Sequence, residues 1–219
     1  MTSYTHRTIF SHSLFFTFIA GGSPAYEEFL DFIGDRITLR GWDKYRGGLD
    51  VKNDDTGKES VYTTHKIYEV MFHVCTMLPV LGIDTQKVER KRHIGNDVVV
   101  LVFKEQSSKD DKFNPLIFTS HFIHCIFVVT PEVVESDKEN TYYRLSVANK
   151  PGVPTYPPFL PENPVFKKGK EFQEFLIAKM INAERAAYAS PEFASLYTSR
   201  KERLDLLCKE FAADDPGDN

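Results

Sequence analysis

The spacing of apolar and polar residues predicts a sheet in the middle of the chain. Residues 68–78, 98–103 and 122–129 place β-branched and large apolar side chains at both odd and even positions, as strands covered on both faces do. Residues 142–147 alternate more regularly between apolar and polar side chains. The pattern therefore predicts a sheet of four or more strands.

The segment before these strands predicts a helix followed by turns. Residues 25–33 carry an apolar face and stop at Gly34, which is typical of a short amphipathic helix. The connection that follows contains glycine-rich stretches at 47–48 and 55–57. Because glycine tolerates positive φ, these two stretches predict sharp reversals of the chain.

In the last third of the chain, apolar residues recur at spacings of three and four positions. After a proline-rich segment, this spacing predicts a long helix over residues 168–188, with Lys179 and Glu184 facing solvent. A Ser-Pro pair then opens a predicted second helix, at about 191–211, because serine favours the N-cap and proline the first turn. The fold class is therefore α/β: a single domain with a central mixed β-sheet flanked by helices, two of them C-terminal.

An apolar segment, residues 1–22, precedes these elements. Its run IFSHSLFFTFIA is interrupted by polar residues and is shorter than the roughly 20 apolar residues that cross a bilayer. No other stretch approaches an integral membrane span. Three interpretations of the segment stay open: a buried strand, a signal-like segment, and a non-native start to the chain. The domain is expected over residues 23–212, with a disordered tail over 213–219.

Composition narrows the class of protein. The 219 residues are 42% apolar and 26% charged, with a formal charge of −4, which is typical of a folded soluble domain and excludes a disordered chain. The acidic balance argues against a general nucleic-acid or anionic-membrane binder, because both need an excess of cations. Three separated cysteines without a C-x-x-C pair favour a reducing compartment, and hence a cytoplasmic location.

Histidines close to cysteines do not predict a metal site. Residues three apart in a strand face opposite sides, so His121 and His124 cannot readily share an ion. His73 and Cys75 share a strand face among apolar neighbours, which favours a core histidine beside a buried thiol. We therefore expect no metal site.

One segment, residues 84–98, has helical propensity but almost no apolar face. Asp84 can cap its start, Gly95 can end it, and cations in the last turn complement the helix dipole. Four cations against Glu89 give a local charge of +3, which would attract an anionic partner or a phosphate group. A solvated surface helix accounts for the same charges. The four cations are Lys87, Arg90, Lys91 and Arg92.

The string RKRHIGND at residues 90–97 resembles the signature of the Rap/Ran-GAP family of GTPase-activating proteins. The resemblance extends over about residues 23–211 and includes YRGGLDV, SVYTTHKIYEVMFHVCTMLP, SHFIHCIFVV and EFQEFLIAKMINAE. Through these strings the chain is most similar to the Rap-directed branch. The resemblance implies an activator that is not itself an enzyme and acts on a Rap-like small GTPase in the GTP-bound form. Consistently, the sequence has no GxxxxGK[ST] loop for a nucleotide.

The resemblance also implies which residues act. Asn96 is the expected catalytic residue, an "Asn thumb" supplied in trans, and His93 is expected to support it. The cations Lys87, Arg90, Lys91 and Arg92 are expected to bind the partner, and Gly95 and Asp97 to give structural support. A neutral carboxamide suits this task because its oxygen accepts a hydrogen bond from water while its NH2 group donates to phosphate. The protein needs no cofactor of its own, since the partner carries GTP and Mg2+.

Two alternatives to this function stay open. The chain could be a non-catalytic module that binds a small GTPase, or its substrate could be Rheb or Ral instead of Rap. Residues 1–22 do not match the dimerisation region of Rap-directed members, so dimerisation is in doubt. A cytoplasmic protein of this kind would reach membranes through its GTPase partner.

Overall fold

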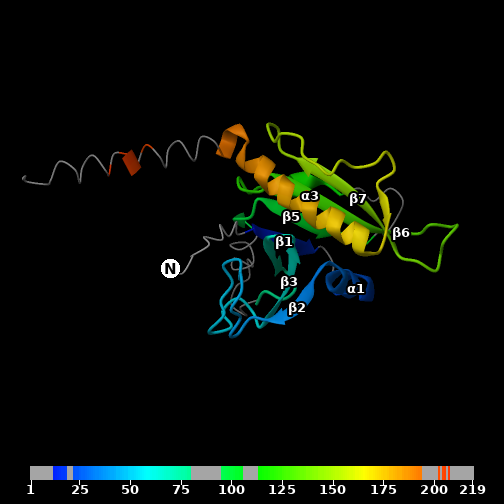
Figure 1. Ribbon diagram of the computed structural model, residues 1–219, viewed down its shortest axis with the longest axis horizontal. Helices are drawn as coiled ribbons and strands as arrows, with labels where there is room; N and C mark the ends of the chain where they lie inside the picture. Colours follow the sequence, from blue (N-terminus) through cyan, green and yellow to red (C-terminus); the bar gives the residue numbers. More distant parts are fainter. Residues whose placement is uncertain are drawn as a thin grey trace, which may run out of the picture.

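The computed structural model describes the backbone of residues 12–18 and both backbone and side chains of 22–79, 95–105, 113–193, 202, 204, 205 and 207. Within these residues a mixed sheet of eight strands forms the centre of the molecule (Figure 1). The strands are ordered β2-β3-β4-β1-β5-β6-β7-β8, so β1 joins a group of three strands to a group of four. Their bounds are β1 His12–Phe18, β2 Asp35–Thr38, β3 Glu59–His65, β4 Tyr68–Val74, β5 Val99–Phe103, β6 Cys125–Glu132, β7 Tyr142–Asn149 and β8 Val165–Lys167.

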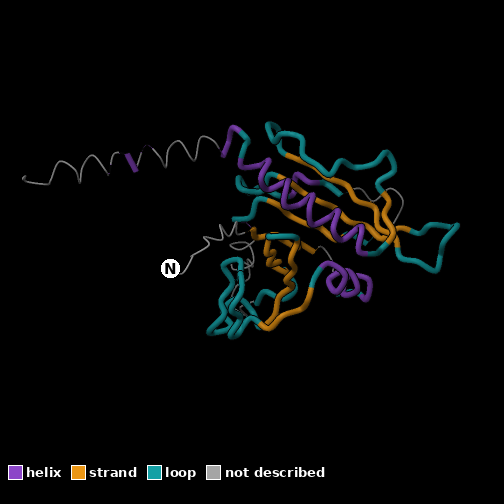
Figure 2. Tube along the Cα trace, viewed as in Figure 1, coloured by secondary structure: helices purple, strands orange, loops and turns teal. Residues whose placement is uncertain are grey.

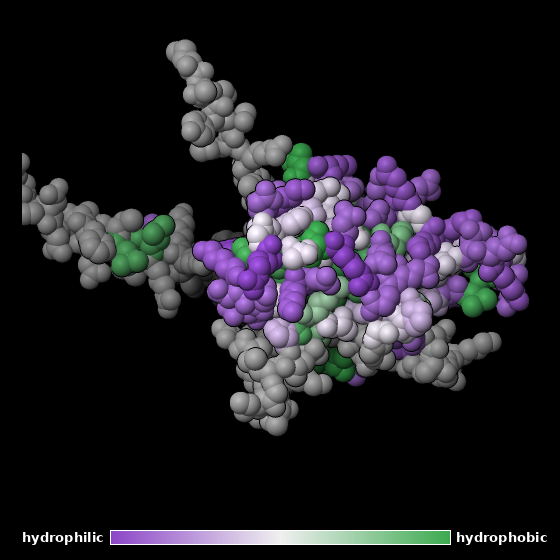
Figure 3. All heavy atoms as spheres, turned by 90° about the horizontal axis from the view of Figure 1, so that it is seen from below, coloured by the Kyte–Doolittle hydropathy of each residue, from purple (hydrophilic) through white to green (hydrophobic). Residues whose placement is uncertain are grey.

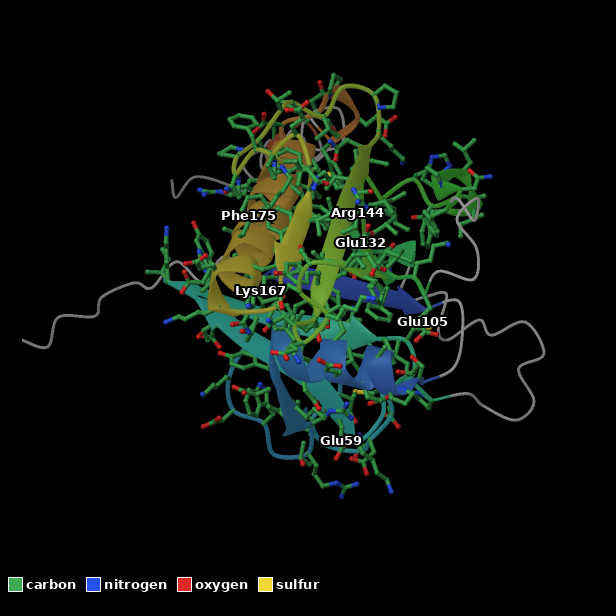
Figure 4. All side chains as sticks on the ribbon, turned by 90° about the vertical axis from the view of Figure 1, so that its right-hand side faces the viewer. Glu59, Glu105, Glu132, Arg144, Lys167 and Phe175 are labelled. Carbon is green, nitrogen blue, oxygen red and sulfur yellow. The ribbon has the colours of Figure 1, made fainter. Side chains whose placement is uncertain are left out.

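The middle of the sheet is parallel and its flanks are antiparallel. Strands β4, β1, β5 and β6 run in one direction, whereas β2, β3, β7 and β8 pair antiparallel with their neighbours. All five residues of β5 are buried, as expected for a parallel strand covered on both faces. On the antiparallel flank, Arg144 of β7 forms two hydrogen bonds of 3.0 Å with Glu132 of β6 (Figure 4).

The sequence pattern found the buried strands better than the edge strands. The four predicted strands correspond to β4, β5, β6 and β7, although β4 ends at Val74 and β6 begins only at Cys125. Strands β2, β3 and β8 were not predicted. Strand β8 has three residues and β3 is rich in threonine, so neither carries the long apolar run that marked the others. His121 and His124 therefore precede β6 rather than lie within a strand.

Two helices cover one face of the sheet. Helix α1, Pro24–Ile33, and helix α3, Lys170–Tyr188, pack with alternate residues of β4 to β7 in one apolar core. Figures 1 and 2 show α3 lying over the strands and running in nearly the same direction as β5 and β7. Aromatic rings join the layers, since the ring centroids of Phe29 and Phe103 are 5.0 Å apart. The predicted second C-terminal helix, at about 191–211, lies mostly outside the described residues.

The opposite face of the sheet is covered by connections. Leu39 and Leu49, from the connection between β2 and β3, pack on Tyr62 and Met71. Ile123, from the connection between β5 and β6, packs on the even-numbered residues of β5. Among the described elements, both helices therefore lie on the other face of the sheet. The connection between β5 and β6 also contacts the turn that precedes β5, through Ser120 and Gly95.

The prediction that Lys179 and Glu184 face solvent is wrong. Both side chains of α3 are buried, with exposed fractions of 5% and 3%. The Lys179 ammonium donates hydrogen bonds to the carbonyl oxygens of Tyr156, at 3.3 Å, and Pro158, at 2.8 Å. Glu184 accepts a hydrogen bond of 3.0 Å from the Tyr188 hydroxyl. The proline-rich segment folds over Lys179, which the helical period of α3 alone does not reveal.

The described part of the face in Figure 3 is largely hydrophilic. Among the residues coloured in Figure 3, apolar side chains lie in small separate groups between polar ones. No helix in the described part of the chain combines the length and the apolar content that a membrane span requires.

Candidate functional site

Asn96 lies in the turn that leads into the centre of the sheet. Gly95 is helical, Asn96 forms a turn, and β5 begins at Val99. The Asn96 side chain is exposed, whereas Asp97 and Val98 after it are buried. The turn thus presents one polar side chain between a helix end and a buried strand.

The carbonyl group before Asn96 is held by a side chain from another connection. The Ser120 hydroxyl donates a hydrogen bond of 2.6 Å to the carbonyl oxygen of Gly95. The same hydroxyl oxygen accepts a hydrogen bond of 3.1 Å from the backbone N–H of Phe122. Gly95 is therefore tied to the connection between β5 and β6.

The carboxyl group after Asn96 is held from β4. Oδ2 of Asp97 lies 3.3 Å from Nδ1 of His73, and both side chains are buried. Nε2 of His73 lies 2.6 Å from the carbonyl oxygen of Gly47. Because a carbonyl oxygen only accepts hydrogen bonds, Nε2 carries a proton.

Burial governs the charge of Asp97. Removal from water raises the pKa of this carboxyl from 3.8 to about 7, since burial penalises the charged form. The nearby His73 imidazole acts in the opposite direction, and Glu184 of α3 adds a small further increase in the pKa. With the carboxyl protonated, its O–H can donate to Nδ1 of His73. A neutral pair of this kind suits a site that is shielded from water.

The Gly47 turn matches the reversal that the sequence predicted. Gly47 has φ of 59° and Gly48 has φ of 84°, a region that glycine adopts without strain. A Cβ atom on Gly47 would lie 3.1 Å from Cβ of Met71 and 3.4 Å from Nε2 of His73. Glycine therefore permits the close approach that brings its carbonyl oxygen to His73.

The chain enters the sheet directly after Asp97. The carbonyl oxygen of Val98 accepts hydrogen bonds from the backbone N–H groups of His124, at 2.8 Å, and Cys125, at 3.1 Å. These bonds begin the pairing of β5 with β6. The residues on both sides of Asn96 are thus fixed, while the side chain of Asn96 itself remains exposed.

Only part of the predicted site falls within the described residues. Asn96, Gly95 and Asp97 lie together in the turn. The remaining predicted site residues, Lys87, Arg90, Lys91, Arg92 and His93, lie outside the described residues. Within the described ranges, no three His, Cys, Asp or Glu side chains form a group that could hold a metal ion.

Sequence reasoning missed the residues that hold the turn. The prediction of a core His73 is confirmed, but its contact with Asp97 is not predicted, and Ser120 carries no signal at all, although it contacts Gly95. Ser120 is separated from Gly95 by 25 positions. No local pattern pairs these residues, because their contacts depend on how the strands are ordered in the sheet.

Comparison with known proteins identifies the family of this fold and site. The sequence model of the family described as Rap/ran-GAP matches residues 16–204. The chain is 47% identical over 193 residues to "GTPase-activating Rap/Ran-GAP domain-like protein 3" of Mus musculus, covering 88% of this chain and 18% of that protein. It is 45% identical over 189 residues to human "Signal-induced proliferation-associated 1-like protein 2", covering 86% of this chain and 11% of that protein.

A solved structure shares the fold. The "Structure of the TSC2 GAP domain" superimposes with a TM-score of 0.67 at 27% sequence identity, covering 80% of this chain and 96% of that chain. The chain spans less than a fifth of the length of the curated relatives described above, 18% and 11%. The similarity is therefore to one domain of those proteins.

Proposed function

The chain belongs to the Rap/Ran-GAP family, and on that premise we propose that it is a GTPase-activating protein for a Rap-type small GTPase. Asn96 supplies the catalytic amide in trans, while the GTPase brings GTP and Mg2+. The observation that carries this proposal is the turn at residues 95–97. An exposed amide stands between two backbone positions that are held from other parts of the fold.

The amide suits the reaction. Phosphoryl transfer to water passes through a loose transition state, so catalysis depends mainly on positioning the water and stabilising charge. The carbonyl oxygen of Asn96 accepts a hydrogen bond from the attacking water, and its NH2 group donates to a phosphate oxygen. Both contacts use a neutral side chain, whereas an aspartate at this position would repel the phosphate groups.

Rigidity of the turn supports the same role. A reacting group must be held close to its productive position, and a displacement of about 1 Å can cost roughly 10²-fold in rate. Asn96 gains this support from the Ser120 contact before it and the His73 contact after it. Its backbone therefore has little freedom to move when the GTPase docks.

The basic residues before the turn serve association. Lys87, Arg90, Lys91 and Arg92 carry positive charge on a chain whose formal charge is −4. A local field of this sign attracts the anionic surface around a bound nucleotide and raises the rate of encounter. His93 supports the turn from the preceding residues. These assignments rest on the sequence pattern and the family resemblance.

Rap is the proposed substrate class because similarity to Rap-directed proteins extends along the chain. The relative with 47% identity carries "Rap/Ran-GAP" in its name. Rheb and Ral are the alternative substrates. Comparing the three GTPases side by side, under the conditions of the experiment below, identifies the preferred one.

Single-turnover GTP hydrolysis by Rap tests the proposal. The purified chain is added over a range of concentrations to Rap loaded with GTP, and the maximal rate at saturation is measured. We expect Asn96→Ala to lower that rate by about 10²- to 10³-fold, the usual cost of removing one positioned donor from a transition state. Asn96→Asp should fail similarly, because the carboxylate repels phosphate.

Asn53→Ala is the matched control, since Asn53 is an exposed asparagine in a different loop. This variant should stimulate Rap as the unchanged chain does. Equal stimulation by Asn96→Ala would overturn the catalytic assignment. Saturable binding of the unchanged chain without any stimulation of Rap, Rheb or Ral would identify a non-catalytic binding module instead.

A further inference from the structure

The carbonyl oxygen of Gly95 needs a partner because Gly95 is helical and the turn at Asn96 follows it. The last carbonyl groups of an α-helix have no donors within the helix and must be satisfied by other groups. Here the donor is the Ser120 hydroxyl, at 2.6 Å. This bond is short and lies one residue before Asn96. It therefore restricts the direction in which the backbone enters the turn.

Ser120 is itself held firmly. Its hydroxyl oxygen accepts the Phe122 N–H at 3.1 Å, which fixes the side-chain rotamer. The Lys150 ammonium donates to the carbonyl oxygens of Ser120, at 3.1 Å, and His121, at 2.8 Å. The backbone N–H of Lys150 donates to the carbonyl oxygen of His124 at 2.8 Å. Ser120 is therefore attached to the residue that follows β7.

The contact of Asp97 with His73 gives the turn a second fixed point. Two fixed points on either side of one residue define the path of the backbone between them. With the Asp97 contact alone, the chain before Asn96 could rotate about that contact, and the amide would point in several directions. The Ser120 bond removes this freedom.

We propose that Ser120 is a positioning residue for Asn96, acting through its hydrogen bond to the carbonyl oxygen of Gly95. It does not touch the GTPase nucleotide, and it contributes to hydrolysis only by holding the catalytic amide in its productive direction. The proposal rests on the proposed function of Asn96 and names a residue that this function requires. It assigns to the connection between β5 and β6 a role in catalysis as well as in covering the sheet.

The test separates the maximal rate from association. Single-turnover hydrolysis by Rap loaded with GTP is measured against the concentration of the chain, well below the melting temperature of each variant. Ser120→Ala should lower the maximal rate roughly 10- to 100-fold, in line with the cost of a displaced catalytic group. The half-saturating concentration should change less than about 2-fold. Ser120→Thr keeps the hydroxyl and should restore most of the rate.

Gln173→Ala is the control for a simple loss of stability. The Gln173 side chain donates a hydrogen bond of 2.8 Å to the carbonyl oxygen of Phe32, so its removal also costs one side chain to backbone bond. This bond joins α3 to α1, and the variant should keep the maximal rate. Melting temperatures of the two variants, measured by circular dichroism, show whether their stabilities are comparable.

The possible outcomes distinguish the positioning role of Ser120 from the proposed catalytic role of Asn96. An unchanged maximal rate for Ser120→Ala, with Asn96→Ala inactive, would overturn the role of Ser120 and leave the proposed function intact. Full activity of Asn96→Ala would reject the proposed function itself. A rate loss in Ser120→Ala that Ser120→Thr does not restore, or that Gln173→Ala reproduces, would also contradict the positioning role.

Discussion

Asp97 and Asn96 are adjacent residues with opposite environments. The carboxyl of Asp97 is buried against His73, while the amide of Asn96 is exposed. Burying a polar group costs free energy unless it forms hydrogen bonds, so the pair of Asp97 with His73 must be kept intact for the turn to fold as observed. The contact of buried Asp97 with His73 thus helps to fix the backbone that carries exposed Asn96.

The raised pKa of Asp97 predicts a pH dependence of stability. Burial raises the pKa of its carboxyl from 3.8 to about 7, so between these values the folded chain keeps a proton that the unfolded chain has lost. The contribution of Asp97 to the free energy of unfolding is therefore greatest below pH 4 and decreases as pH rises through 7. Urea denaturation at several pH values measures this trend.

Asp97→Asn is the informative variant. The amide resembles the protonated carboxyl and can donate to His73, so the variant should keep the fold while losing the pH-dependent contribution. The difference between the two chains should grow with pH from about 4 to 7, by up to about 1.4 kcal/mol per unit of pKa shift. A difference that shrinks over this range would contradict a raised pKa.

At the scale of the element, α3 is buried on more sides than its sequence indicates. One face packs on the sheet through residues such as Leu176 and Met180. The side carrying Lys179 is covered by the proline-rich segment, where the Lys179 ammonium lies 4.5 Å from the centre of the Tyr156 ring. Burial lowers the pKa of Lys179, and the two carbonyl contacts stabilise its charge.

Removal of Lys179 should destabilise the protein. Lys179→Ala leaves the carbonyl oxygens of Tyr156 and Pro158, which are buried and partly buried, without this donor, at a cost of about 2–3 kcal/mol in the free energy of unfolding. Lys170→Ala is the control, because Lys170 lies exposed at the start of the same helix and should change stability by less than about 0.5 kcal/mol. Urea denaturation compares the two variants. Equal effects would show that the buried contacts of Lys179 add no stability.

The strands also differ in how well their own sequences predict them. Strand β5 was predicted closely because all of its side chains are apolar and both of its faces are buried. Strand β3 mixes buried and exposed positions, and its pairing with β4 depends on a turn at Lys66, where φ is 56°. Short strands at the flanks gain their structure from neighbours, so their own residues carry a weak signal.

At the scale of the whole molecule, the two faces of the sheet have different tasks. The helices α1 and α3 close the main core on one face. The connections on the other face bring Gly47 to His73 and Ser120 to the turn at Asn96. Loops placed by a rigid sheet are common locations for functional residues, because the sheet fixes their ends.

The distribution of charge predicts salt-dependent association. The chain is acidic overall, with a formal charge of −4, but carries its four cations together before the turn. Arg92→Ala should raise the half-saturating concentration for Rap and weaken its dependence on salt, with the maximal rate unchanged, because exposed charges are screened within about 8 Å at 0.15 M ionic strength. Hydrolysis assays between low and high salt measure both quantities.

Lys138→Ala removes the same charge from the hairpin between β6 and β7 and serves as the control. It should leave the half-saturating concentration and its salt dependence as they are. A loss of maximal rate in Arg92→Ala, at saturating concentration, would instead indicate that this guanidinium contacts phosphate in the transition state.

The sequence by itself determined the local features of this protein. Apolar residues at both parities predicted the buried strands, helical spacing predicted α1 and α3, and the string around Asn96 indicated the family. The tertiary structure decided which distant residues meet: His73 with Asp97, Ser120 with Gly95, and Lys179 with the proline-rich segment. These contacts depend on strand order and on the path of long connections. The periodicity of apolar residues predicts which face of a helix or strand is apolar. Which element packs against that face depends on how the whole chain folds.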